Sequence, residues 1–263
     1  MVETEVEALC REHGWSGRPG DLIASLCREL LEEVGARVPV DVAVLASARG
    51  VSEVREAEQE EAGCILFEGD RLVIQVRARD PETRRRFTVC HEICHTFFPA
   101  LGARRVDETV GEFSEADPIE YLCDVGAAEL LMPRQPFCSE MPEGDLRVDD
   151  VLRLADCFRS GPQATSIRLA GLHTGPFAVV SIERAKQNAP WTIAWSATKG
   201  TSRIARGTAA KDGPVTRAGE DETVEVTGEF SFTPGRFRAT ARLAPYGSGE
   251  GTIERVLAVL VPA

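Results

Sequence analysis

The chain has 263 residues, of which 43% are hydrophobic and 27% are charged, and its formal net charge is −12. This composition is typical of a soluble globular protein with one large domain or two modest ones. No run of about 18 apolar residues occurs, which argues against a membrane span, and the acidic balance argues against nucleic acid as the main partner.

The first two thirds of the sequence predict mainly helices. Asp21 is a plausible N-cap, Gly35 a plausible helix end, and apolar residues recur between them at helical spacing. Asp80-Pro81 opens another helix. In chain order we predict helices over 21–35 and 39–50, a β-hairpin over 64–78, a helix over 80–98, a polar loop over 103–118, a helix over 118–131 and two short helices within 148–172.

From Pro176 onward the pattern changes to strands. Five segments alternate or run apolar at strand length, with Gly, Pro, Asp and Asn between them. These segments are "FAVVSIE", "WTIAWSA", "ETVEVTGEFSF", "RFRATARLA" and "ERVLAVLV". They predict a second, β-rich region of about 90 residues.

The cysteine pattern and the N-terminal sequence indicate the cellular compartment of the protein. The eight cysteines include no CxxC pair, so a cysteine-based zinc cage is a weak interpretation, and a disulfide framework is weak for a long chain without an export signal. The N-terminus "MVETEVEALCREHGW" is acidic and lacks the pattern of a signal peptide. We therefore expect a cytoplasmic protein in which most cysteines are small buried residues.

Residues 86–98, "RFTVCHEICHTFF", hold two of the four histidines of the chain. At about 100° per residue, His91 and His95 lie on the same side of a helix one turn apart, away from the apolar arc that contains Cys90 and Cys94. Two such imidazoles can hold one Zn²⁺, and Glu92 stands beside them, placed to take a proton from a water that the metal activates. The alternative is a helix with two satisfied surface histidines.

A catalytic zinc needs a third protein ligand. His13 and His173 are candidates, but the helix over 118–131 is better, because Glu120 and Asp124 share a face there with small or apolar neighbours. A carboxylate turned towards an apolar face needs a partner. Glu120 would bind the metal and Asp124 would accept the free N–H of a ligating histidine. The alternative is an exposed acidic turn favoured by the helix dipole.

Two motifs together resemble a known family. "RRRFTVCHEICHTFF" is followed, 25 positions after His95, by "EYLCDVGAAELLMP", and this order and spacing resemble the ImmA/IrrE family of zinc metallopeptidases. The resemblance covers about residues 20–172 and places Glu120 on the family's third ligand. Departures are Asp124 and Gly126, where the family commonly has asparagine and phenylalanine, and Cys90 and Cys94 in place of small residues.

The resemblance implies a function. It implies a centre with one Zn²⁺ per chain and cleavage of a helix-turn-helix transcriptional repressor, which switches on stress-response or mobile-element genes. Glu92 is the expected catalytic residue, and His91, His95 and Glu120 are the expected ligands. Tyr121, His173 or an arginine is the candidate donor to the oxyanion. The alternative is a DNA-binding or repressor-sequestering regulator in which the zinc site is not catalytic.

These inferences define an α+β chain in three parts. Residues 1–135 are expected to form a zincin-like metallopeptidase domain, 136–173 a helical, helix-turn-helix-like segment and 174–263 a β-rich C-terminal domain. Arg159 and Arg168 could contact DNA from the helical segment, but the net charge of −12 favours a structural helical pair. The expected partner is therefore a protein substrate, with neither membrane binding nor direct DNA binding.

Overall fold

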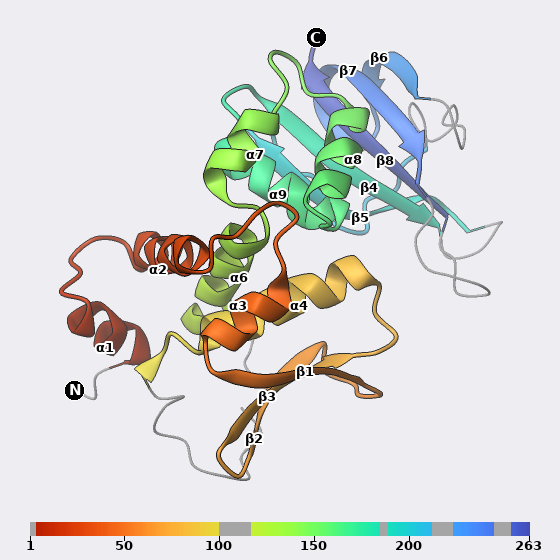
Figure 1. Cartoon of the computed structure of the whole chain (residues 1–263). Helices are drawn as coiled ribbons and strands as arrows, with labels where there is room; N and C mark the ends of the chain where they lie inside the picture. Colours follow the sequence, from red (N-terminus) through yellow and green to blue (C-terminus); the bar gives the residue numbers. More distant parts are fainter. Residues whose placement is uncertain (1–3, 100–116, 185–188, 212–222, 245–253) are drawn as a thin grey trace. The chain divides into compact units, whose positions relative to one another are not determined.

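The computed structural model describes residues 4–99, 117–184, 189–211, 223–244 and 254–263 (Figure 1). The predicted α+β class is confirmed, since these residues form helices and two separate β-sheets. They group into two compact units: the first comprises Met1–Pro136 and Cys157–Ser160, and the second comprises Phe137–Asp156 and Gly161–Ala263. Among the described residues, no helix is long and apolar enough to cross a membrane.

The first unit combines five helices with a three-stranded sheet in the part of the chain that the structure describes. Its elements are α1 (Glu5–Glu12), α2 (Pro19–Glu33), α3 (Val42–Ala48), β1 (Val51–Ala57), β2 (Gly63–Glu68), β3 (Arg71–Arg77), α4 (Glu82–His95) and α6 (Pro118–Leu131). The sheet order is β1-β3-β2, with β1 parallel and β2 antiparallel to β3. The predicted hairpin is thus confirmed, whereas α1 and β1 were not predicted. Most of the loop predicted over 103–118 lies outside the described residues.

Helices α2, α4 and α6 form the core of this unit. Helix α6 packs against both α4 and α2, and the predicted apolar positions of α2 are buried. Gly126 of α6 marks a close approach, because a Cβ there would lie 2.4 Å from the Cys94 sulfur and 2.9 Å from the Cγ2 of Ile23. The Cys27 thiol donates to the Gly126 carbonyl at 3.6 Å. Cysteine sulfurs therefore fill the space beside this glycine.

Two arginines fix helix α4 at its two ends. The buried Arg86 guanidinium donates to the carbonyls of Val40 (2.7 Å) and Arg159 (3.2 Å). Beyond the C-terminal end of the helix, Arg49 donates to the side chain and the carbonyl of Thr96 (2.9 and 2.8 Å). Because the carbonyls at a helix C-terminus lack partners within the helix, the Arg49 bonds stabilise that end. The segment that carries the histidines is thus held on both sides.

The second unit contains a five-stranded antiparallel sheet and three helices within the described ranges. Its elements are α7 (Arg134–Glu140), most of which belongs to this unit, α8 (Val148–Cys157), α9 (Pro162–Leu172), β4 (Phe177–Arg184), β5 (Thr192–Lys199), β6 (Val224–Phe230), β7 (Thr233–Leu243) and β8 (Glu254–Pro262). The strand order is β5-β4-β8-β7-β6. All five predicted strands are present, and α7 was not predicted.

The sheet of the second unit is buried on both faces of its central strands. Alternate residues of β4, β7 and β8, such as Val180 and Ala258, enter one core cluster with Phe230 and Phe232. On the other face, Thr240 accepts a hydrogen bond from the Val148 N–H at the start of α8 (2.9 Å), and α9 packs against β5 (Figure 1). Burial on both faces explains the continuous apolar runs of the sequence.

The two predicted short helices within 148–172 are therefore present as α8 and α9, and both pack on this sheet. Apart from Cys157 at the end of α8, both helices group with the sheet in the second unit. Arg159 lies in the turn between the helices at a φ of 47°. Arg159 belongs to the first unit, and its guanidinium pairs there with Glu82. Arg168 also has an interaction partner.

Candidate metal centre

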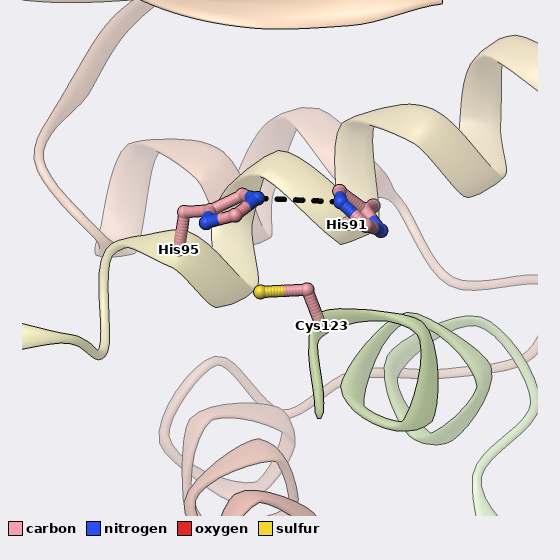
Figure 2. A group of neighbouring side chains, drawn as sticks. All are labelled: His91, His95 and Cys123. Carbon is pink, nitrogen blue, oxygen red and sulfur yellow. Dashed lines mark hydrogen bonds between the residues drawn. The ribbon is translucent and has the colours of Figure 1, made fainter. Parts of the chain in front are cut away.

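Two imidazoles meet on one face of α4. The Nε2 atoms of His91 and His95 lie 3.2 Å apart, and their rings are edge to face at 5.0 Å between centroids (Figure 2). His95 is buried and His91 half-buried. This arrangement follows from the four-residue spacing on a regular helix, and two convergent nitrogen donors can bind one cation.

Glu120 of α6 completes a set of three donors. Its Oε2 lies 3.1 Å from His91 Nε2, and its Oε1 lies 3.3 Å from His95 Nε2. Oε1 is buried and has no hydrogen-bond partner among the described residues. An unpartnered buried carboxylate oxygen is costly unless a cation or a donor satisfies it. The structure thus brings together the three residues that the sequence predicted as ligands.

Asp124 contacts the opposite side of the His91 ring. With its proton on Nδ1, His91 donates a hydrogen bond to Asp124 Oδ1 at 2.9 Å. This bond leaves Nε2 as the free donor atom and fixes the orientation of the ring. Asp124 therefore lies where the sequence predicted a carboxylate that orients a ligating histidine.

The titration behaviour of the cluster reflects these contacts. Burial lowers the pKa of His91, but its hydrogen bonds with Asp124 and Glu120 outweigh burial and raise the pKa to about 10. Burial raises the pKa of Glu120, but its interactions with both imidazoles outweigh that effect and lower the pKa to about 2. His91 is thus a cation at neutral pH unless a metal ion displaces its Nε2 proton.

Glu92 is buried between α4 and the start of β2. A Cβ on Gly63 would lie 2.8 Å from Glu92 Oε1 and 2.3 Å from Thr88 Cγ2, so only glycine leaves room for the carboxylate in this position. Burial raises the pKa of Glu92, while the charges of His95 and His91 oppose that rise. A buried carboxylate whose pKa is raised is a better proton acceptor, which suits a general base.

Cys123 is a donor that the sequence analysis missed. Its buried thiol sulfur and the donor nitrogens of His91 and His95 all lie within 4.8 Å of one another (Figure 2). Cys123 follows Glu120 by three positions and precedes Asp124, so the helical spacing that selected the two carboxylates would also have selected it. His91, His95 and Cys123 form a possible metal site.

Comparison with known proteins identifies the region around this site. Residues 50–170 match the model of peptidase family M78, described as the IrrE N-terminal-like domain. These residues belong to that family. The resemblance inferred from the two sequence motifs is therefore confirmed, and the match indicates a metallopeptidase-like domain over residues 50–170. No curated protein matches the chain.

Solved structures extend the comparison beyond the IrrE N-terminal-like domain. A Mycobacterium tuberculosis transcriptional regulator is 14% identical, with a TM-score of 0.59 over 98% of this chain and 80% of that chain. At this identity the likeness shows the fold alone.

The remaining predicted candidates lie elsewhere. Tyr121 follows Glu120 on α6, and its side chain is exposed. His173 belongs to the second compact unit, where its ring packs edge to face on Phe177. His13 caps the C-terminal end of α1, whereas the donor set lies on α4 and α6. The roles suggested for these three residues remain predictions.

The donor set fits a divalent metal such as Zn²⁺. Zinc binds imidazole nitrogens, carboxylate oxygens and thiolates, and the site offers all three types from α4 and α6. The observation that favours an ion is the buried Oε1 of Glu120, which makes no hydrogen bond and has only an ion-pair contact with His95 Nε2 at 3.3 Å, so that a cation between the carboxylate and the imidazole pair would satisfy it. His91 and His95 would hold the ion together with Glu120.

Proposed function

We propose that this chain is a zinc-dependent endopeptidase of narrow specificity that cleaves a helix-turn-helix transcriptional repressor in the cytoplasm. The observation that carries the proposal is the convergence of Glu120 on the Nε2 atoms of His91 and His95, at 3.1 and 3.3 Å, beside the buried carboxylate of Glu92. Three protein donors with a neighbouring base are the parts that a hydrolytic zinc site requires.

Each residue of the site has a distinct role in the proposed peptide hydrolysis. When bound, one Zn²⁺ ion supplies Lewis-acid polarisation of the peptide carbonyl and makes water more acidic. The Glu92 carboxylate takes a proton from the attacking water and delivers it to the departing amide nitrogen. Asp124 keeps His91 in the tautomer that leaves Nε2 free, and the exposed Tyr121 hydroxyl is the proposed donor to the carbonyl oxygen, with His173 as the other candidate.

An extended peptide suits the surface beside Glu92. Strand β2 pairs only with β3 within the described residues, so its other edge is unpaired there. Because Gly63 begins β2 and lies against Glu92, a substrate strand added to this edge would pass the base. Main-chain hydrogen bonds along a sheet edge are a common way to hold a peptide in extended form.

The choice of a repressor as substrate rests on the family. The ImmA/IrrE resemblance implies cleavage of a helix-turn-helix repressor that derepresses stress-response or mobile-element genes, and the M78 match of residues 50–170 supports this assignment. The alternative is a regulator that binds DNA or sequesters the repressor while the zinc site is not catalytic. One similar structure is that of a transcriptional regulator, so the experiment must also be able to detect this alternative.

The test combines metal analysis with cleavage of a recombinant helix-turn-helix repressor encoded beside this gene. We expect one zinc per chain, and one cut in the repressor, detected by mass spectrometry. Glu92→Gln should keep the zinc and slow cleavage by about 100- to 10,000-fold, whereas Glu120→Ala should lose zinc. Glu32→Gln, at an exposed position of α2, is the matched control.

The same experiment separates the alternatives. Full cleavage by Glu92→Gln refutes the catalytic assignment. Repressor binding by wild type and by His91→Ala, without any cut, supports sequestration. A gel shift of promoter DNA that weakens with salt and with Arg168→Ala supports DNA binding instead.

A further inference from the structure

We propose that Cys123 is a fourth protein ligand that closes the metal site, so that the resting protein cleaves slowly and becomes fully active when this sulfur leaves the ion. The inference rests on the proposed function, since it concerns the same ion. It is carried by the position of Cys123, whose sulfur and the donor nitrogens of His91 and His95 lie within 4.8 Å of one another (Figure 2).

Helix α6 presents three side chains to the imidazole pair. Glu120, Cys123 and Asp124 occupy positions i, i+3 and i+4, which share one face of a helix. Glu120 contacts both imidazoles and Asp124 contacts His91, so this face is already aligned on α4. Cys123 lies between two residues that both contact the imidazole pair.

The four donors would make a closed coordination shell. Catalytic zinc sites have three protein ligands and an open position, whereas four protein ligands are the mark of a structural site. Two neutral imidazoles, one carboxylate and one thiolate also balance the charge of a divalent ion, which favours this set in a half-buried position. Bonds of about 2.0–2.3 Å require the donors to close in on the ion, and the Cys123 sulfur turns on a single side-chain bond.

Cobalt substitution tests the inference without a substrate. Chelator-treated protein is loaded with one equivalent of Co²⁺, and the near-ultraviolet absorption that a thiolate ligand gives to Co²⁺ is recorded. We expect this band in wild type and in Cys27→Ala, and its loss in Cys123→Ala. Cys27 is a matched control, because it is also a fully buried cysteine of the first unit. Cys123→Ser provides a second variant if the alanine variant does not fold.

Azide reports whether a coordination position is open. Azide should leave the visible Co²⁺ spectrum of the wild type unchanged, but it should shift the spectrum of Cys123→Ala and of Cys123→Ser. In a separate assay, these two variants should cleave the repressor faster than the wild type. Wild type that binds Co²⁺ without a thiolate band, or with an azide shift, overturns the inference but leaves the peptidase proposal intact. Wild type that binds no Co²⁺ defeats both.

Discussion

Gly63 is the residue through which the sheet positions the proposed base. A Cβ built on Gly63 would lie 2.3 Å from Thr88 Cγ2 and 2.8 Å from Glu92 Oε1, whereas carbon atoms in contact are ordinarily about 3.5–4.0 Å apart. In Gly63→Ala, either β2 withdraws from α4 by about 1 Å or Thr88 and the Glu92 carboxylate move. Thr88 is β-branched and stiff, so both the strand and the carboxylate are expected to shift.

The steric overlap of the added methyl group determines how much Gly63→Ala loses in stability and in cleavage rate. Overpacking a well-packed core typically costs about 1–3 kcal/mol, which corresponds to a fall in Tm of roughly 2–12 °C for a protein of this size. Displacing a catalytic group by about 1 Å can slow a reaction about 100-fold. Zinc content should stay at the wild-type level, because the added methyl group meets none of the proposed ligands His91, His95 and Glu120.

Three measurements on purified Gly63→Ala decide the matter: zinc per chain, thermal unfolding and the rate of repressor cleavage. The matched control is Gly20→Ala in α2, whose Cβ would meet only Leu122 Cδ2, at an ordinary 3.9 Å. That control should unfold and cleave like wild type, or be slightly more stable because alanine favours a helix. If Gly63→Ala has the wild-type Tm and cleavage rate, then Gly63 does not position Glu92 as the structure indicates.

Three further predictions test the surroundings of the site. Gly126→Ala should lower the free energy of unfolding by about 1–3 kcal/mol, because its Cβ would lie 2.4 Å from the Cys94 sulfur; adding Cys94→Ala should restore part of the loss, and a double variant no more stable than Gly126→Ala would contradict this. Arg86→Lys should cost about 1–3 kcal/mol in chemical denaturation, since one ammonium cannot replace the two guanidinium N–H groups that reach the separate carbonyls of Val40 and Arg159, whereas the exposed Arg84→Lys should cost nothing measurable. In chelator-treated protein the pKa of His91 is raised to about 10, so its stabilising contribution is complete below its ordinary pKa of about 6.5 and is lost as the pH rises through about 10; the Tm advantage of wild type over His91→Gln should shrink over that range, and a constant difference would refute the assignment.

Strong periodicity explains which elements could be predicted from the sequence. The helix over 118–131 and the five C-terminal strands have long apolar patterns bounded by proline, glycine or polar residues, and all of them are present. Strand β1, "VSEVREA", was missed because polar and charged residues occupy most of it and only Val51 is buried. Helix α1 was missed for a similar reason, since Leu9 is its only buried residue.

The sequence predicted those residues of the candidate site whose positions follow from the spacing along a single helix. His91 and His95 share one helix, so their spacing alone brings them together, and the face of α6 pointed to Glu120 and Asp124. Cys123 lies on that same face, but it was grouped with the cysteines expected in the core. The place of Gly63 beside Glu92 could not be predicted, because it depends on the packing of β2 against α4, which no local pattern in the sequence specifies.

Gly126, which has no side chain, sets the distance between helices α4 and α6. Gly126 lies on the buried side of α6 and lets the Cys94 sulfur and Ile23 approach its backbone. A larger residue there would force α6 away from α4, and it would move Glu120 and Cys123 with it because all three belong to one rigid helix. The carboxylate has only about 3 Å between itself and the imidazoles, so a shift of about 1 Å would exceed the tolerance of metal bonds of about 2.0–2.2 Å. The convergence of the metal donors therefore depends on the close packing at Gly126. A larger residue at position 126 would need smaller residues in place of its cysteine neighbours to keep that packing.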